Sequence, residues 1–338
     1  MAGGPPATIL VYVGLDAVGD GLMKLPFLRA LRTAFPQARI TWMAGKGHTV
    51  YAGTLAPLVA GLADEVLDQA AVGSRVAELF GRRPLDGRRF DLIVDTQRRL
   101  LTTLILRRVR HGRFISAAAN FLLSAARPPA GWKRPAAMVG QLMTLVELAS
   151  GRPADAAAPL PRDPECERLA DSLLPPGAVY VGFAPGAGGK HKCWPLERFV
   201  EVARHQHDAG RVPVFLLGPA EAGWAEQVRA ALPQALLPLQ GLASTPPALT
   251  IALGRRLAAA AANDSGTGHM LAAADAPLVS LFGPTPPEKF APAARRLAVV
   301  RAQDFGADAM EAIPVAAVEQ ALERMLAEGA AGTDPALL

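Results

Sequence analysis

The feature that most constrains the fold is an alternation of short apolar runs with helix-length segments. Both halves of the chain show this alternation. The apolar runs lie at 8–14, 38–45, 91–97, 178–186, 212–219, 255–264 and 276–285. Helix-length segments between them include 20–36, which Pro36 ends, and 196–210. Apolar strands separated by helices are typical of parallel sheets in α/β proteins. The sequence therefore predicts two α/β domains with Rossmann-like parallel sheets.

Length and composition agree with two folded domains. The chain has 338 residues, of which 51% are hydrophobic and 19% charged, a balance that disfavours disorder. A stretch rich in Pro and Ala at 150–164 has the character of a linker. We therefore expect one domain over 1–155 and another over 156–338, with the final helix free to pack back on the first.

The residue pattern disfavours both a disulfide-rich protein and a membrane-spanning protein. Cys166 and Cys193 are too few for a disulfide framework and match no metal motif, as expected for a reducing compartment. No run reaches the roughly 18 apolar residues that span a bilayer. The longest candidate, 114–126, is flanked by Arg113 and Arg127. We expect it to form a core helix, or alternatively a helix lying in a membrane interface.

Charge is distributed unevenly between the two halves. Residues 1–150 contain 19 Lys and Arg against 10 Asp and Glu, although the whole chain has a net charge of only +5. Such a basic half is suited to phosphates of nucleic acid, of lipid headgroups or of an anionic substrate. A solvated Arg-rich surface is the alternative interpretation.

The first loop of interest follows the first expected strand and reads GLDAVGDGLMKLP. Gly14, Gly19 and Gly21 permit a tight backbone, but their spacing does not form the dinucleotide-binding pattern G-x-G-x-x-G. Asp20 falls at or beside a helix N-terminus. It is either a helix cap or a catalytic acid or base.

A second loop, APGAGGKHKCWPLERF, opens the second half. It is not a Walker loop, because Ala184 stands at its first glycine position and His191 follows the lysine. Its glycines and lysines still suit a phosphate, since they expose backbone N–H groups and supply charge before a helix. The glycines are Gly186, Gly188 and Gly189, and the lysines are Lys190 and Lys192.

The third loop, NDSGTGHMLAAADAPLVSLFGPT, combines an acid, hydroxyls, glycines and a histidine ahead of a helix. Asp264, Ser265, Gly266 and Thr267 place successive N–H groups at that helix start, which predicts an anion-binding site. His269 lies in the first turn, within reach of the same anion. The sequence Gly283-Pro284-Thr285 ends the following strand at the same edge of the sheet.

Taken together, these blocks resemble glycosyltransferase family 9, the lipopolysaccharide heptosyltransferases. The matching blocks are Gly19-Asp20, then Lys192-Cys193-Trp194-Pro195, then Asp264-Ser265-Gly266 with His269, and then Phe282-Gly283-Pro284-Thr285. The resemblance spans roughly 8 to 290. It implies the GT-B fold, in which two Rossmann-like domains face each other across a cleft, with the acceptor on the N-terminal side and the nucleotide-sugar on the C-terminal side.

The resemblance also implies roles for individual residues. Asp20 is expected to be the general base on the acceptor hydroxyl, and Lys192 to neutralise the departing diphosphate. On the donor side, the expected contacts are Gly186, Gly188, Lys192, Glu221, Asp264, Ser265, Gly266, Thr267 and His269. On the acceptor side, they are Gly19, Lys24 and Arg98. Hydroxyl contacts from the loop before Lys192 are not expected, because Ala187 stands there with two glycines.

The function implied is that of an inverting glycosyltransferase that uses no metal and no cofactor. The implied donor is a nucleotide-sugar, ADP-heptose, and the acceptor is a lipopolysaccharide core or related glycan. The expected location is the cytoplasm, with peripheral contact to the anionic inner face of the membrane and no nucleic-acid partner. The alternatives are a sugar-nucleotide epimerase of similar architecture and a non-catalytic nucleotide-sugar-binding protein.

Overall fold

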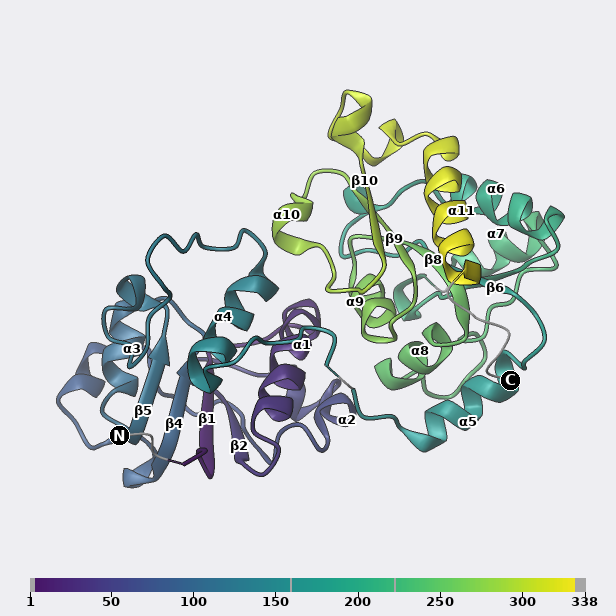
Figure 1. Ribbon diagram of the computed structural model, residues 1–338. Coiled ribbons are helices and arrows are strands. Elements are labelled where there is room, and N and C mark those ends of the chain that lie inside the picture. Colours follow the sequence, from purple (N-terminus) through teal and green to yellow (C-terminus); the bar gives the residue numbers. More distant parts are fainter. Residues whose placement is uncertain (1–3, 159, 222, 332–338) are drawn as a thin grey trace. The chain divides into compact units, whose positions relative to one another are not determined.

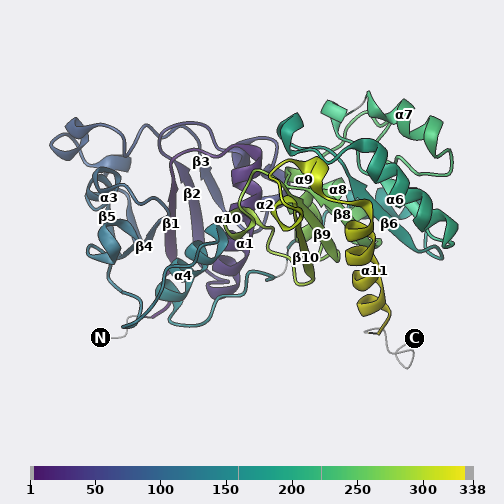
Figure 2. The ribbon, with the colours of Figure 1, turned by 90° about the horizontal axis from the view of Figure 1, so that it is seen from above.

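The computed structural model describes residues 4–158, 160–221 and 223–331. They form two compact units, Met1–Pro161 and Arg162–Leu338. Each unit contains one five-stranded parallel sheet with helices packed on it (Figures 1 and 2). The predicted fold class, two Rossmann-like parallel-sheet units, is confirmed.

The sheet of the first unit has the strand order β3-β2-β1-β4-β5. Its strands are β1 (Thr8–Val13), β2 (Arg39–Ala44), β3 (Glu65–Leu67), β4 (Arg89–Asp95) and β5 (Arg110–Ser116). The helices are α1 (Val18–Ala34), α2 (Ala56–Val59), α3 (Leu100–Leu106) and α4 (Met138–Ser150). Leu10 and Tyr12 of β1 pack with Ile105 and Leu106 of α3. Ile9 and Val11 are fully buried on the opposite face, which explains why β1 reads as a continuous apolar run.

The sheet of the second unit has the order β10-β9-β8-β6-β7. Its strands are β6 (Tyr180–Ala184), β7 (Val212–Phe215), β8 (Leu257–Asn263), β9 (Leu278–Phe282) and β10 (Leu297–Arg301). The helices are α5 (Pro164–Leu173), α6 (Leu196–Asp208), α7 (Trp224–Ala231), α8 (Pro247–Gly254), α9 (Gly266–Ala273), α10 (Pro287–Phe290) and α11 (Val315–Ala331). The final helix, α11, packs on α6, β8, β9 and β10 of this second unit. Its core contacts include Val318 and Leu322.

The alanine-rich run at 257–263 is the strand β8 although alanine favours helices. It lies between β6 and β9, and its residues Ala259 to Ala262 are fully buried. Tertiary position therefore overrides local propensity.

Each sheet has a point where successive strands are added in opposite directions. In the first unit this point lies between β1 and β4, and in the second unit it lies between β6 and β8. Ligands of open parallel sheets bind beyond the carboxyl ends of the strands at such a point. The three loops selected from the sequence follow β1, β6 and β8, so all three stand at these positions.

The helix expected over 114–126 is absent, and that prediction was wrong. Phe114 and Ile115 continue β5, where they pair with Ile93 and Val94 of β4. The chain then makes a 3-10 turn, η4 (Ala118–Phe121). Within this turn Ala119, Asn120 and Phe121 have φ of 46°, 53° and 63°. A right-handed helix cannot contain such residues. Within the described residues, no helix has the length and apolar character needed to cross a membrane.

Candidate functional site

The second unit has a cavity of about 230 Å³ at the carboxyl ends of its central strands. Residues from the loops after β6, β7 and β8 line it together with α8 and the start of α9. The lining comprises Gly186, Ala187, Gly188, Leu216, Gly218, Pro219, Glu221, Leu239, Thr245, Pro247, Thr250, Ser265, Gly266, Thr267 and Met270. The structure thus brings together most of the residues expected on the donor side.

Asn263, the last residue of β8, ties the two loops of this site together. Its side chain is fully buried. Its Nδ2 donates to the carbonyl of Pro185 at 2.6 Å, and its Oδ1 accepts from the backbone N–H of Trp194 at 3.1 Å. Because a buried amide rarely leaves such bonds unmade, Asn263 fixes both ends of the glycine-rich loop 185–194.

Trp194 is a second anchor of that loop. Its side chain is almost fully buried, and its indole N–H donates to the carbonyl of Ile313 at 2.9 Å. Its ring packs edge-on against Phe199 of α6. In the block Lys192-Cys193-Trp194-Pro195, the tryptophan therefore holds the loop in place, whereas the lysine side chain is partly exposed and pairs with Asp264.

Lys192, Asp264 and Thr285 meet at one carboxylate. The ammonium of Lys192 lies 3.0 Å from Oδ2 of Asp264, and the hydroxyl of Thr285 donates to the same oxygen at 2.7 Å. The Lys192 and Asp264 side chains are 28% and 12% exposed. Three blocks that are far apart in the sequence are thus joined directly beside Ser265, which lines the cavity.

The N-terminus of α9 faces the cavity. Ser265 is its N-cap, and the hydroxyl of Ser265 accepts from the N–H of Gly268 at 3.3 Å. Gly266 and Thr267 occupy the first two helical positions, where backbone N–H groups have no partner within the helix. This arrangement suits a phosphate group, since the helix dipole adds positive potential there.

His269 lies in the first turn of α9 and is half-buried. Burial lowers the pKa of His269 to about 4, with the nearby Asp264 acting in the opposite direction. The imidazole is therefore neutral at physiological pH. It can donate or accept a hydrogen bond but adds no charge to the anion site.

Glu221 reaches the other side of the cavity from the 3-10 turn η6 (Pro219–Glu221) after β7. Its carboxylate packs against two glycines. A Cβ placed on Gly186 would lie 2.4 Å from Oε1 of Glu221, and one on Gly218 would lie 2.9 Å from Oε2. A Cβ on Gly188 would meet nothing within 4 Å. The two glycines expected in this loop therefore differ: Gly186 makes room for a carboxylate and Gly188 does not.

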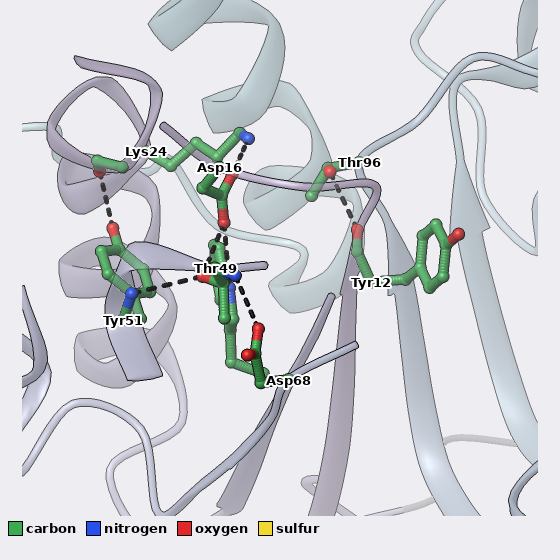
Figure 3. A network of polar contacts seen from close by, with 9 residues as sticks. Tyr12, Asp16, Lys24, Thr49, Tyr51, Asp68 and Thr96 are labelled. Atoms are coloured by element: carbon green, nitrogen blue, oxygen red, sulfur yellow. Dashed lines mark hydrogen bonds and ion pairs between the residues drawn. The ribbon is translucent and has the colours of Figure 1, made fainter. Parts of the chain in front are cut away.

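In the first unit, a buried polar network fixes the loop after β1 (Figure 3). The Asp16 carboxylate pairs with the ammonium of Lys24. It also accepts from the hydroxyl of Thr49 at 2.9 Å and the indole of Trp42 at 3.3 Å. The hydroxyl of Tyr51 donates to the carbonyl of Gly21 at 2.7 Å, which holds the first turn of α1. The structure thus gives Lys24, an expected acceptor contact, an internal partner.

Asp20 stands in the first turn of α1 and is half-exposed. The N-cap of α1 is Ala17, whose side chain makes no cap, so Asp20 is not the helix cap. Within the part of the chain that the structure describes, its carboxylate has no hydrogen-bond or ion-pair partner. Gly19 directly precedes it and is also half-exposed. Asp20 is thus placed at the carboxyl end of β1 with its carboxylate free to bind another group.

Arg98 lies in the loop after β4 and is exposed. The base of that loop is held by Asp95, the last residue of β4, whose carboxylate is fully buried. Asp95 accepts from the hydroxyls of Thr103 and Ser116 at 2.6 and 2.9 Å. Burial raises the pKa of Asp95 to about 6, against the opposing effect of these hydrogen bonds.

A second cavity, of about 500 Å³, lies in the first unit beyond the carboxyl end of β5. Its lining combines aromatic rings with cations, and comprises Asn120, Phe121, Arg127, Pro128, Pro129, Gly131, Trp132 and Arg134. Phe121 and Trp132 contact each other edge to face at a centroid distance of 5.5 Å. This cavity is at the same edge of the sheet as Asp20 and Arg98, since β1, β4 and β5 are parallel neighbours.

Several residues of these sites were not singled out from the sequence. They are Asn263, Asp16 and Asp95, together with Trp132 and Arg134 of the second cavity. Asp16 and Asp95 shared one available signal, an acid within three residues of the end of an apolar strand. Among the described residues, no group of three or more His, Cys, Asp and Glu side chains is arranged to hold a metal ion.

The fold and the second unit's cavity define a Rossmann-type protein in which a helix N-terminus faces a cavity at the carboxyl ends of the strands. The chain belongs to glycosyltransferase family 9 (heptosyltransferase), whose model matches residues 80–312. The match runs through both units and includes the loops around Lys192, Asp264 and Thr285. The family resemblance inferred from the sequence blocks is confirmed.

Two similar curated proteins are heptosyltransferases. Lipooligosaccharide heptosyltransferase 2 of Haemophilus influenzae is 29% identical over 126 residues, which are 36% of this chain and 36% of that protein. Lipopolysaccharide heptosyltransferase 1 of Pseudomonas aeruginosa is 38% identical over 125 residues, which are 36% of this chain and 33% of that protein. The chain therefore matches only about a third of the length of these relatives.

Solved structures resemble the chain over almost its whole length. A family 9 glycosyl transferase from Veillonella parvula has a TM-score of 0.69 at 20% identity and covers 95% of this chain and 98% of its own. The E. coli heptosyltransferase WaaC, solved with ADP, has a TM-score of 0.66 at 18% identity, with 94% and 99% covered. At these identities the likeness supports the fold alone.

Proposed function

We propose that this chain is an inverting, metal-independent glycosyltransferase. It transfers a sugar, heptose from ADP-heptose, to a lipopolysaccharide core or a related glycan. The observation that carries the proposal is a cavity lined by the N-terminus of α9 and by Glu221, with the ion pair of Lys192 and Asp264 directly beside its lining residue Ser265. A cation and helix N–H groups at one end and a carboxylate at the other suit a nucleoside diphosphate.

On the donor side, the diphosphate binds at the N–H groups of Ser265, Gly266 and Thr267. Lys192 neutralises the charge that develops on the leaving group. Asp264 pairs with the Lys192 ammonium until the donor binds, and the hydroxyl of Thr285 donates to the Asp264 carboxylate. Glu221 accepts hydrogen bonds from the ribose, in the space that Gly186 leaves for its carboxylate. His269 is neutral and supplies a hydrogen bond without charge.

On the acceptor side, Asp20 is the general base that removes the proton of the attacking hydroxyl. Its free carboxylate and its place in the first turn of α1 support this role. The network around Asp16 and Lys24 positions the loop and the start of α1. Gly19 and Arg98 flank the acceptor, and we assign Lys24 a positioning role because its ammonium is already paired.

The chemistry follows from these placements. In a single displacement, the acceptor oxygen attacks the anomeric carbon while the bond to the diphosphate breaks, so the configuration inverts. The proton passes from the acceptor hydroxyl to Asp20, and the negative charge that leaves is met by Lys192 and the helix dipole.

Labelled nucleotide-sugars provide the test. The protein is incubated with ADP-heptose labelled in the sugar, with or without lipopolysaccharide of truncated core. We expect label in the lipopolysaccharide, free ADP, and an anomeric configuration opposite to that of the donor. Interconversion of the nucleotide-sugar without acceptor would indicate an epimerase, and binding without turnover would indicate a non-catalytic binding protein.

We also propose that the protein works in the cytoplasm, in reversible contact with the inner face of the membrane, where a glycolipid acceptor is held. The excess of Lys and Arg over Asp and Glu in 1–150 supports this, since anionic lipids attract basic residues near their surface. No nucleic-acid partner is proposed.

A further inference from the structure

The first unit carries exposed apolar side chains on α3 and on, or directly after, two turns that each contact α3. The 3-10 turn η2 (Val76–Leu79) and the turn η4 both contact α3. Figure 1 shows α3 beside the blue segment that contains η2. This set of side chains, which we call the α3 surface, comprises Val76, Phe80, Leu100, Leu104 and Leu122.

These side chains are well exposed. Phe80 is 84% exposed and Val76 60%, and the three leucines range from 38% to 62%. Leu100 and Leu104 are four residues apart and therefore share one face of α3. The opposite face of that helix enters the core through Ile105 and Leu106, whereas Leu100 and Leu104 lie outside this core cluster.

Phe80 is held outward by a fixed backbone. The Arg108 guanidinium donates to the carbonyls of Glu78 and Gly81, at 2.5 Å in the case of Gly81. The Glu78 carboxylate accepts from the N–H groups of Gly73, Ser74 and Arg75. Because these hydrogen bonds already fix the backbone of the turn, little further conformational entropy is lost when Phe80 inserts into an apolar surface.

Arginines border the α3 surface. Arg82 and Arg83 follow Phe80 in the chain, and Arg98 precedes Leu100 by two residues. All three are exposed, and in the described part of the chain their side chains have no ion-pair or hydrogen-bond partner. Exposed apolar side chains with unpaired cations next to them in the chain are the pattern of an interfacial membrane site.

We propose that the α3 surface docks the protein on an anionic lipid bilayer, with Phe80 and Leu100 entering the interface and Arg82 and Arg83 contacting lipid phosphates. This rests on the proposed function in that a glycolipid acceptor gives the contact its purpose. Charge complementarity favours lipid over a second copy of the chain, because self-association would bring Arg82 and Arg83 close to like charges. The surface adjoins the carboxyl end of β4, where α3 begins, on the acceptor side of the first unit.

Vesicle binding tests the proposal. The full chain is sedimented with vesicles of phosphatidylcholine alone or mixed with phosphatidylglycerol, at low and high salt. We expect binding to the anionic vesicles, released by salt. The paired change Phe80→Ser and Leu100→Ser should weaken it at least about tenfold. The paired change Arg82→Ala and Arg83→Ala should weaken it about 30-fold.

The matched control is Phe305→Ser, which removes an exposed phenylalanine of the second unit that is 42% exposed. It should leave vesicle binding unchanged. An equal loss in this control, or equal binding to both kinds of vesicle, would overturn the proposal. A wild-type dimer that the Phe80 and Leu100 changes convert to a monomer would show that the surface covers a second copy instead.

ADP affinity separates this proposal from the proposed function. The surface variants should bind ADP like the wild type, because none of the changed residues lines the donor cavity. If the chain uses no nucleotide-sugar but still binds anionic vesicles through Phe80, the enzyme proposal fails and the surface remains. If the chain transfers the sugar but does not bind anionic vesicles, the α3 surface proposal fails and the enzyme proposal remains.

Discussion

Gly186→Ala should weaken donor binding without destabilising the fold. The new Cβ would lie 2.4 Å from Oε1 and 2.5 Å from Cδ of Glu221, closer than atoms can approach. Because these atoms end a flexible, half-buried side chain, Glu221 can turn away instead of straining the backbone. The cost is then the charged hydrogen bond to the ribose, about 1.5 to 3 kcal/mol, or about 10- to 150-fold in ADP affinity.

Gly223→Ala is the control, since Gly223 does not line the donor cavity and its Cβ would meet nothing within 4 Å. Titration calorimetry with ADP should give a wild-type affinity for this variant, and thermal unfolding should give similar Tm values for both. Combining Gly186→Ala with Glu221→Ala should add little to either change alone, because both remove one contact. Equal losses for the two glycine variants, or additive losses in the double variant, would refute the reasoning.

Four further outcomes are expected. Lys192→Ala should weaken ADP binding by about 10- to 100-fold. Asp264→Asn should not weaken it, because this change frees the Lys192 ammonium. Titration calorimetry with ADP compares the two variants. Asp20→Asn should lower kcat by about 10²- to 10⁴-fold at unchanged ADP affinity, and a normal kcat would contradict its role as base. The folded pKa of Asp95, about 6 against an ordinary 3.8, should cost about 3 kcal/mol of unfolding free energy as pH rises from about 4 to above 6. Urea unfolding should show this decline, and Asp95→Asn should flatten it. Chelation with EDTA should leave transfer unchanged, and recovery by added Mg²⁺ after a loss would defeat the metal-free scheme.

The fold was predictable because buried parallel strands and the helices between them produce a clear local pattern of apolar residues in the sequence. Buried strands such as β1 and β9 are almost entirely apolar, and a glycine follows each of them. The segment 114–126 was mispredicted because its apolar composition suits a helix, whereas pairing with β4 makes Phe114 and Ile115 part of a strand. Strand pairing depends on residues about 20 positions earlier in the chain, which no local pattern contains.

The loops that form the candidate site could be predicted from the sequence, but the hydrogen bonds and ion pairs that hold them could not. The glycines and Asp264 could be read from loop composition, since phosphate sites require exposed N–H groups. The role of Asn263 could not be predicted, because its side chain hydrogen-bonds to the backbone of Pro185 and Trp194, which lie about 70 to 80 positions away in the chain. Asp16 was overlooked beside Asp20, although its burial and its pairing with Lys24 determine where the loop sits.

The pairing of Lys192 with Asp264 bears on how a donor diphosphate could bind. The carboxylate offsets the lysine charge, so the pair alone gives little net attraction for an anion. The N-terminus of α9 remains as the uncompensated positive end, which suits it to the first contact. Once a phosphate is there, the Lys192 ammonium can turn to it while the hydroxyl of Thr285, 2.7 Å from Oδ2, still satisfies Asp264. Without that hydroxyl, the move would leave a carboxylate that is only 12% exposed with no donor, and this cost is comparable to the stabilisation that the phosphate gives the ammonium. On the proposed function, Thr285 therefore allows the lysine to change partners, which gives a physical reason for the Gly283-Pro284-Thr285 block to lie beside the Asp264 block.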